Sequence, residues 1–150
     1  MSAPLVENAP SDYDADAVLA AEDQVRDYCG WHIAPSRTET LTLDGTGTAI
    51  LLLPTVYVTA ITSIVENGVT ILGTTNYGYT WSEGGLVERI GAYWTWKRRA
   101  ISITLTHGYP VCPASVRREV ARLAAASYAT PAPLSEESQA ALRPYQVRSF

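Results

Sequence analysis

The sequence predicts an α+β fold in which two packed helices, at about 12–29 and 113–129, flank an inserted small antiparallel β-barrel or sandwich at about 37–106, with extended arms at both termini. Apolar residues recur at helical spacing near both ends of the chain, and β-prone runs separated by turn residues occupy its middle. With 150 residues, 47% of them hydrophobic, the chain can bury one real core. We expect a single domain made of a flexible arm (1–10), a first helix (11–30), the β module (37–106), a second helix (113–130) and a C-terminal arm (131–150).

The first helix is predicted from an apolar stripe with signals at both ends. Ser11 or Asp12 can cap its N-terminus, and Gly30 suits its C-terminal cap. Pro35 stops the helix from continuing and holds Ala34 extended, so the chain turns a corner there. The stripe consists of Val18, Leu19, Ala21, Val25 and Tyr28.

Turn residues divide the β module into short antiparallel strands. Asp44-Gly45, Asn67-Gly68 and Gly84-Gly85 each lie between two β-prone runs, which indicates three hairpins. In the last run, Ile101, Ile103 and Leu105 alternate with polar residues and should share one face. Roughly seven strands of this kind indicate a barrel or a sandwich.

The second helix opens at Pro113, because proline is tolerated at the first helical position, and it ends before Pro131. Its apolar stripe consists of Val116, Val120, Leu123, Ala124 and Tyr128. This stripe should pack against that of the first helix. The C-terminal arm has room for one short helical turn and finishes in YQVRSF, a β-prone hexamer without a partner strand nearby in the sequence.

Charge is unevenly distributed along a chain whose net charge is −4. Acidic residues dominate up to Gly30, whereas basic residues dominate from Lys97 to Arg122. The two regions either form solvated faces of one molecule or guide a head-to-tail contact between copies. The net charge does not suggest a nucleic-acid binder. The sequence shows no secretory signal and no apolar run of membrane-spanning length, so we expect synthesis in a cytoplasm.

Two cysteine–histidine pairs are the best candidate for a metal site. Cys29-x-x-His32 and His107-x4-Cys112 flank the β module and offer four ligands that zinc accepts. Neither spacing is that of a standard zinc finger, and the core is large enough to fold without a metal. We therefore favour buried structural cysteines, with both histidines bonded to nearby backbone groups, and expect no metal and no cofactor.

Asp44-Gly45-Thr46-Gly47 matches the tetrad of aspartic proteases, whose chemistry needs a second aspartate loop. Because the tetrad lies between two β-prone runs, a hairpin turn is the better interpretation. Cys29 with His32 or His107 can be drawn as a nucleophile–base dyad, but no GxSxG, HExxH or glycine-rich phosphate loop supports an enzyme. We expect no catalytic residue.

Aromatic residues cluster in the second half of the β module, at Tyr77, Tyr79, Trp81, Tyr93, Trp94 and Trp96. Such residues fill cores and protein interfaces, and they also bind sugars or bases. YWTWKRR places aromatic rings beside three basic side chains, as the surfaces of some nucleic-acid-binding proteins do. Trp94 and Trp96 have strand spacing and can share one face, so we favour packing or a protein interface.

Three blocks in a fixed order give the chain a family resemblance: YCGWHIAPS, LLLPTVYVTAITSIVENG, and THGYP followed by PASVRREVARLAAASYA. Together they resemble the head-to-tail adaptor (head-tail connector) proteins of long-tailed, siphovirus-type phages, and most of all those of phages that infect actinobacteria. The resemblance covers approximately Ala15 to Thr130. No single block is specific, but their order and spacing make a chance likeness improbable.

The resemblance implies a structural virion protein of the neck, made in the host cytoplasm, and not an enzyme. Such adaptors form a dodecameric ring beneath the portal, extend the DNA channel and offer a platform to the stopper and tail proteins. The expected partners are therefore other copies of the chain, the portal and the stopper or tail-completion protein. Genomic DNA should pass through the lumen without specific binding, and no membrane is involved.

Within this interpretation three groups of residues receive hypothetical roles. The subunit interface should join Asp16, Asp23 and Asp27 of one copy to Arg117, Arg118 and Arg122 of the next, unless these charges pair within one protomer. Portal binding by strand addition is assigned to Pro144, Tyr145, Gln146, Val147, Arg148, Ser149 and Phe150, unless that terminus is disordered. The helix-to-strand corner should be built by Gly30, Trp31, Ile33 and Pro35.

A second function class remains open. The tyrosine and tryptophan cluster would suit a β module that binds glycans or proteins in a phage tail or host-recognition apparatus. Glycan binding by a monomer would favour that class, whereas ring formation or portal binding would favour the adaptor.

Overall fold

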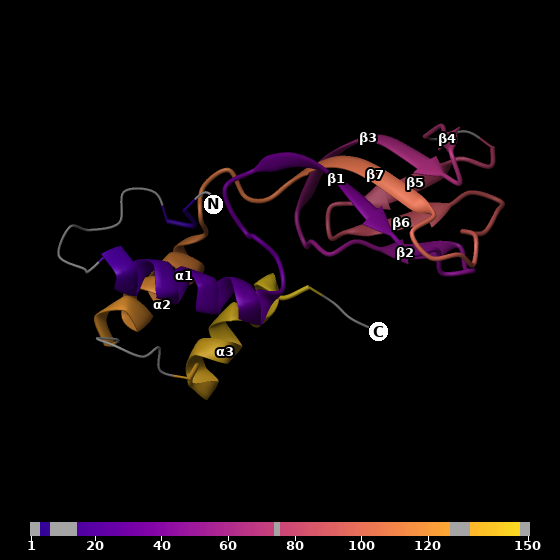
Figure 1. Cartoon of the computed structure of the whole chain (residues 1–150). Coiled ribbons are helices and arrows are strands. Elements are labelled where there is room, and N and C mark those ends of the chain that lie inside the picture. Colours follow the sequence, from indigo (N-terminus) through magenta and orange to yellow (C-terminus); the bar gives the residue numbers. More distant parts are fainter. Residues whose placement is uncertain (1–3, 7–14, 74–75, 127–132, 148–150) are drawn as a thin grey trace. The chain divides into compact units, whose positions relative to one another are not determined.

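A computed structural model describes residues 4–6, 15–73, 76–126 and 133–147 of the chain. The chain forms two compact units: a helical unit drawn from residues 1–36 and 109–150, and a β unit of residues 37–108 (Figure 1). The predicted α+β fold is confirmed, and the β unit is inserted in the sequence between two helices, as expected. No helix among the described residues is long and apolar enough to cross a membrane.

The helical unit contains α1 (Ala15–Cys29), α2 (Ala114–Ala126), α3 (Glu136–Leu142) and the 3-10 helix η1 (Arg143–Tyr145). α1 packs against α2, as predicted, and α2 contacts α3. The expected helix ends at 11–14 and 127–130, with the candidate caps Ser11 and Asp12, lie outside the described residues.

Apolar faces explain why α1 and α2 pack together. The buried residues are Ala17, Val18, Ala21, Glu22, Val25 and Cys29 in α1, and Val116, Glu119, Val120, Leu123 and Ala124 in α2. The prediction that Leu19 belongs to the apolar stripe is wrong, because this side chain is 55% exposed. At about 100° per residue, Leu19 lies roughly 120° around the helix from the buried Val25. Glu22 occupies a position on the buried face instead.

The C-terminal segment is not an extended arm over its described part, because residues 133–147 contain α3 and η1. Ser135 caps α3 by accepting a hydrogen bond from the Ser138 N–H (3.1 Å), and two glutamates follow in the first turn. Leu142, at the other end of α3, is fully buried. The cap at Ser135 and the buried Leu142 therefore explain why this segment forms a helix, where the sequence pattern alone predicted an extended arm.

The described part of the N-terminal arm also contacts the helical unit. Leu5 and Val6 are buried, and the Leu5 N–H donates a hydrogen bond to the Glu22 carboxylate. The expected looseness of this arm is therefore wrong at these two residues. A buried carboxylate needs hydrogen-bond donors, and the arm supplies one.

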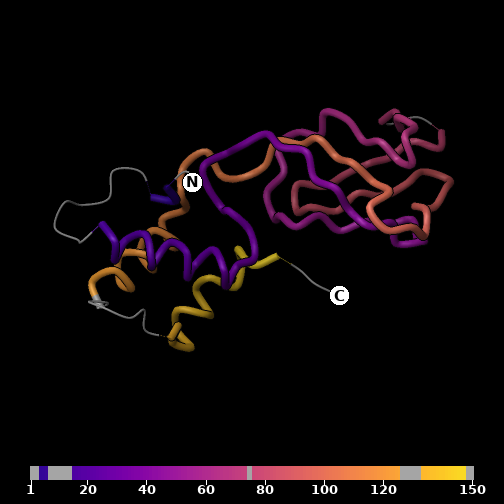
Figure 2. The backbone as a smooth tube through the Cα atoms, viewed as in Figure 1, coloured from indigo at the N-terminus to yellow at the C-terminus, as the bar shows by residue number. Residues whose placement is uncertain are grey.

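The β unit consists of β1 (Arg37–Leu43), β2 (Ile50–Leu52), β3 (Val58–Glu66), β4 (Val69–Ile71), β5 (Tyr79–Ser82), β6 (Leu86–Arg89) and β7 (Ile101–His107). These described strands form two antiparallel sheets and no closed barrel: one sheet has the order β1-β7-β3-β4, and the other has the order β2-β6-β5. β1 and β7, far apart in the sequence, run side by side in the backbone trace (Figure 2).

Two of the three predicted hairpins are confirmed. β3 and β4 are joined by Asn67-Gly68, whose φ angles of 51° and 81° suit a tight two-residue turn, and β5 pairs with β6 across Gly84-Gly85. The hairpin predicted at Asp44-Gly45 is wrong, because β1 pairs with β7 and β2 pairs with β6. Residues 44–48 instead fold against a distant segment, since Gly45 N–H bonds Lys97 O and Trp94 N–H bonds Thr48 O, both at 2.8 Å.

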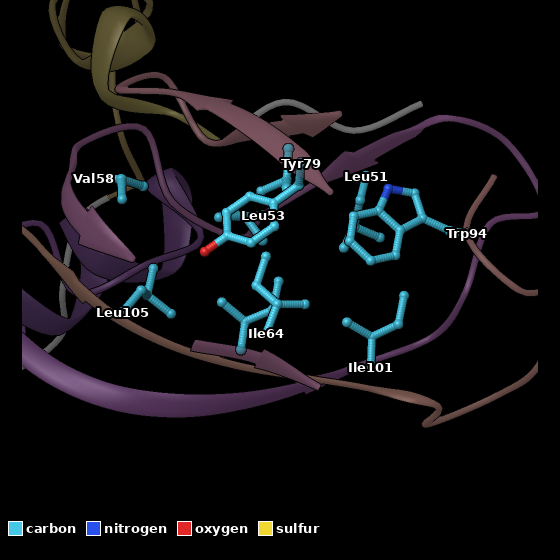
Figure 3. Packing of buried hydrophobic residues seen from close by; sticks show 10 residues of the cluster. Leu51, Leu53, Val58, Ile64, Tyr79, Trp94, Ile101 and Leu105 are labelled. Carbon is cyan, nitrogen blue, oxygen red and sulfur yellow. The ribbon is translucent and has the colours of Figure 1, made fainter. Parts of the chain in front are cut away.

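The core of the β unit lies between its two sheets (Figure 3). Its buried members are Leu51, Leu53, Val58, Ile64, Tyr79, Val87, Trp94, Ile101, Ile103 and Leu105. The predicted shared face of β7 is confirmed, because its three apolar residues are fully buried while the alternate residues are partly exposed. The unit thus holds a core of its own.

Candidate assembly surfaces

The corner after α1 is built from buried apolar side chains at a point where the helix must end. Gly30 has a φ of 84°, a conformation that glycine adopts without strain, and its N–H bonds Arg26 O at 2.7 Å. Trp31 is 7% exposed and Ile33 is fully buried, so both lie in the interior of the helical unit. The Ala34–Pro35 peptide bond is cis.

Arg26 holds this corner through a contact that sequence reasoning did not find. Its Nε donates to the carbonyl oxygen of His32 (2.9 Å), and its Nη2 donates to that of Ala34 (2.8 Å). Charge-assisted bonds of this kind are stronger than neutral ones. An arginine five residues ahead of a Trp-His-Ile-Ala-Pro corner gives no recognisable signal, because its hydrogen bonds form only when the chain turns back toward it.

The C-terminal segment rests on the same corner. The Trp31 indole N–H donates to the Tyr145 carbonyl oxygen (2.5 Å), and the Val147 N–H donates to that of Cys29 (2.9 Å). A Cβ atom on Gly30 would lie 2.8 Å from Val147 Cγ2, so the glycine also makes room for this segment. Of the predicted portal-binding residues, Pro144 to Val147 are therefore placed against the end of α1, whereas Arg148–Phe150 lie outside the described residues.

The candidate zinc ligands do not converge. Among the described residues, no three His, Cys, Asp or Glu side chains are grouped as a metal site would require. His107 bonds the Glu39 carboxylate in the β unit (2.6 Å), and His32 Nε2 lies 2.9 Å from the Pro35 carbonyl oxygen. Burial raises the pKa of both Cys29 and Cys112 to about 11, so both remain thiols at neutral pH and are poor nucleophiles.

The Asp44–Gly47 turn has a structural role. Asp44 Oδ1 accepts a hydrogen bond from the backbone N–H of Arg99 (2.8 Å). A Cβ atom on Gly45 would lie 1.8 Å from the carbonyl oxygen of Thr95, so only glycine fits at this approach. The aspartate that suggested protease chemistry fixes backbone instead.

The exposed face of α1 is acidic. Asp16, Asp23 and Asp27 recur at spacings of seven and four residues, which places them on one side of the helix, away from α2. All three are exposed, and the exposed Leu19 lies among them. We call these four residues the acidic stripe.

The exposed face of α2 carries Arg117, Arg118 and Arg122, which we call the basic face. Arg122 pairs with two carboxylates of its own protomer, Glu119 (2.7 Å) and Glu137 (3.6 Å). Burial acts to raise the pKa of Glu119, but hydrogen bonds with Ser138 and Arg122 lower it overall. The structure therefore keeps Arg122 occupied between α2 and α3, and it leaves Arg117 and Arg118 as the more available cations of this face.

The aromatic cluster divides between core and surface. Tyr79 and Trp94 are buried, whereas Tyr93 and Trp96 are 74% and 82% exposed. Tyr77 and Trp81 are also exposed. The expectation that Trp94 and Trp96 share a strand face is wrong, because residues 91–100 form no strand. We call residues 93–99 the aromatic–basic loop, since Lys97, Arg98 and Arg99 follow the exposed Trp96.

No protein-family model matches the chain, and no curated protein is significantly similar to it. Solved structures of similar fold do match. One is a chain from the neck of a native gene transfer agent (GTA) particle computed with C12 symmetry, with a TM-score of 0.64 and 19% identity over 93% of this chain and 86% of that chain. Another comes from the neck of an empty GTA particle computed with C6 symmetry, with a TM-score of 0.52 and 17% identity over 97% of this chain and 86% of that chain.

At these identities the comparison establishes the fold. The helical unit with its inserted β unit is shared, along nearly the whole length of both chains, with chains solved as parts of particle necks. The chain thus has a fold that chains in the necks of GTA particles also adopt.

Proposed function

We propose that this chain is a structural virion protein of a phage-like neck, and more specifically its head-to-tail adaptor. In this role, twelve copies form a ring beneath the portal, extend the DNA channel and join the capsid to the stopper and tail. The chain then acts through shape and self-association, not as an enzyme. Its place is the virion, between the portal and the tail, and genomic duplex DNA passes through it without specific binding.

Two independent observations support the proposal. The three sequence blocks of the resemblance fall on the corner after α1, on β2 and β3 with the turn that follows, and on the end of β7 with α2. The fold is that of a GTA neck chain over 93% of this chain, in an assembly computed with C12 symmetry. The observation that carries the proposal is that the sequence blocks and the fold point to the same kind of particle, because a fold alone does not determine a function.

Electron microscopy of the purified protein mixed with the portal ring of its own particle tests the adaptor role. We expect an additional ring on the portal with the rotational symmetry of the portal. The protein alone can remain monomeric, because a ring of this kind can require the portal as a template. A protein that binds neither the portal nor other copies of the chain at micromolar concentration would contradict the proposal.

Within the ring, we propose that the acidic stripe of one copy contacts the basic face of the next. A ring needs a heterologous contact, in which one surface meets a different surface of the neighbour. The two surfaces carry opposite charge and lie on the exposed sides of α1 and α2. Complementary charge would guide the register of the contact more than its affinity.

A charge-swap experiment tests this contact. Because Arg122 is held by two glutamates, the sharper variant is Arg117→Glu with Arg118→Glu, which should abolish ring formation on the portal. Adding Asp23→Arg and Asp27→Arg to that variant should restore rings. Reversal of Lys97 and Arg98 is the matched control and should leave rings intact. Normal rings from the Arg117/Arg118 variant would mean that these charges do not form the contact.

We also propose that Pro144–Phe150 binds the portal by adding a strand to an exposed sheet edge. Gln146 already has β-region backbone angles (φ −82°, ψ 134°), as strand addition requires. Deletion of Arg148–Phe150 should preserve the fold and weaken portal binding. Deletion of Pro144–Phe150 should weaken it further and also lower the melting temperature, because Tyr145 and Val147 contact the corner. Normal portal binding by both deletions would exclude this role.

The exposed rings of Tyr93 and Trp96 favour one alternative, a β unit that binds glycans or proteins in a tail or host-recognition apparatus. Screening the monomer against a panel of neutral glycans distinguishes this function, since the adaptor role predicts no glycan binding.

A further inference from the structure

The aromatic–basic loop carries the largest group of uncompensated positive charge in the β unit. Lys97–Arg99 are consecutive and exposed, and no ion pair involves them among the described residues. The other two basic residues of this unit, Arg37 and Arg89, each pair with a glutamate, at 3.3 Å and 3.2 Å. The charges of Arg37 and Arg89 are therefore neutralised within the β unit, whereas those of Lys97–Arg99 are available to a ligand.

The carboxylates near the loop are engaged with its backbone. Asp44 Oδ1 accepts from the Arg99 N–H (2.8 Å), and Glu66 Oε2 accepts from the Thr95 N–H (2.9 Å). Glu66 also pairs with Arg89. These acids shape the loop and offset only part of the charge of its three cations.

The loop is held rigidly beneath its exposed side chains. Trp94 is buried in the core and its N–H bonds Thr48 O, while Gly45 N–H bonds Lys97 O, both at 2.8 Å. A surface whose backbone is fixed before binding loses less entropy when a ligand arrives. The exposure of Trp96 is therefore built into the loop and does not result from a loose segment.

Trp96 is presented in a way that suits a planar ligand. The ring lies against Gly47, where a Cβ atom would come within 3.0 Å of Trp96 Cε3, yet 82% of the residue is exposed. Most of the Trp96 ring is thus open to solvent, while the atoms nearest its backbone lie against the turn at Gly47. Tyr93, 74% exposed, presents a second ring on the same loop.

We propose that the aromatic–basic loop binds an unpaired nucleic acid strand, with Lys97–Arg99 on its phosphates and Trp96, assisted by Tyr93, stacked on its bases. Rings and cations in this combination are the recurring elements of single-strand binding. A neutral glycan would use the rings but not the cations, and an acidic protein surface would use the cations but not an open stacking face. The proposal stands independently of the ring, because it concerns the β unit alone.

The site discriminates against paired duplex. Stacking on Trp96 requires an open base face, and within a duplex each base face is covered by the neighbouring base pairs. Passage of genomic duplex without specific binding is therefore compatible with a site that holds an unpaired segment or end.

Fluorescence anisotropy with the full-length chain tests the site. The probe is a labelled oligothymidylate of roughly 15 nucleotides at low salt, for which we expect saturable binding. Trp96→Ala should weaken binding by about 5- to 150-fold, the range expected for loss of one stacked base, whereas Trp96→Phe should retain most of the affinity. Lys97→Ser with Arg98→Ser should flatten the dependence of log K on log salt by about 1.4, or about 0.7 for each phosphate that is no longer neutralised.

Matched controls separate the site from general charge effects. Trp81→Ala and Arg37→Ser remove an aromatic and a basic residue elsewhere in the β unit and should leave affinity unchanged. Oligouridylate should bind as well as oligothymidylate, because neither rings nor cations read the sugar. The proposal is overturned if the folded wild-type chain shows no saturable binding, or if Trp96→Ala binds as tightly as wild type. Equal affinity for blunt duplex, or equal competition by polyglutamate, would also overturn it, the latter in favour of an acidic protein partner.

Discussion

At the scale of single residues, the corner after α1 is held by burial and hydrogen bonding together. Trp31 fills the interior of the helical unit and donates its indole N–H to Tyr145 O, while Arg26 binds two carbonyl oxygens of the turn. Truncation of a buried aromatic leaves a cavity in addition to the loss of transfer free energy. Trp31 should therefore matter to stability more than any tryptophan on the surface.

We predict that Trp31→Ala lowers the free energy of unfolding by about 3–5 kcal/mol. Trp96→Ala is the matched control, because this residue is 82% exposed, and it should change stability by less than about 0.5 kcal/mol. Urea unfolding followed by circular dichroism measures both. Equal midpoints for the two variants would contradict the anchoring role of Trp31.

Gly45 gives a second residue-scale prediction. A Cβ there would meet the Thr95 carbonyl oxygen at 1.8 Å, so Gly45→Ala should displace the turn and cost at least about 2 kcal/mol of stability. At Gly84 nothing lies within 4 Å of an added Cβ, and Gly84→Ala should be close to neutral. Thermal melting of both variants checks the difference, and a neutral Gly45→Ala would show that the turn can move away at little cost.

At the scale of elements, the sequence predicted what depends on local pattern. Helical spacing identified α1 and α2, and Asn67-Gly68 identified the β3–β4 hairpin. Pairings between distant segments escaped prediction: β1 pairs with β7 across the whole insertion, and the turn after β1 docks on residues 93–99. Turn chemistry at Asp44-Gly45 signals that the chain bends, not which strand it meets.

In the candidate surfaces, too, local features could be predicted from the sequence, whereas contacts between distant segments could not. The exposed acids of α1 and bases of α2 follow from helical periodicity, so their faces could be read from the sequence. The pairing of Arg122 with Glu119 follows from the same periodicity, because the two are three residues apart on α2. The pairing with Glu137 could not be read in this way, because Glu137 reaches Arg122 only through the fold of α3. The exposure of Trp96 beside the buried Trp94 likewise depends on the irregular path of residues 91–100.

The β1–β7 pairing should make the chain sensitive to acid. Burial lowers the pKa of His107 below its ordinary 6.5, although the bond to Glu39 opposes this shift. Burial acts to raise the pKa of Glu39, but His107 and Arg37 lower it overall. Both groups therefore bind protons more readily in the unfolded chain, and stability should fall as the pH drops below 6.5.

Melting temperatures recorded between about pH 7.5 and about pH 5 test this dependence. We expect a decrease of a few degrees on acidification, and a smaller decrease for His107→Gln, which cannot take up the proton. A melting temperature that rises on acidification would show that the protonated pair stabilises the β1–β7 edge, contrary to the expected sign.

At the scale of the whole molecule, the chain consists of two compact units. The helical unit carries the acidic stripe, the basic face and the C-terminal segment, and the β unit carries the aromatic–basic loop. We therefore propose separate parts of the chain for assembly and for ligand binding. The β unit has a core of its own, so we expect it to be stable without the helices.

We predict that residues 37–108 fold when expressed alone. The core of the β unit is drawn entirely from within this range, and the pairing of Arg37 with His107 brings its two ends together at one edge, so excision leaves no strand without its partner. The fragment should show a β-type circular dichroism spectrum and a cooperative melting transition, which Trp94→Ala should abolish because that residue is 1% exposed and belongs to the core of the unit. A fragment without a cooperative transition would mean that the β unit depends on the helices for its stability.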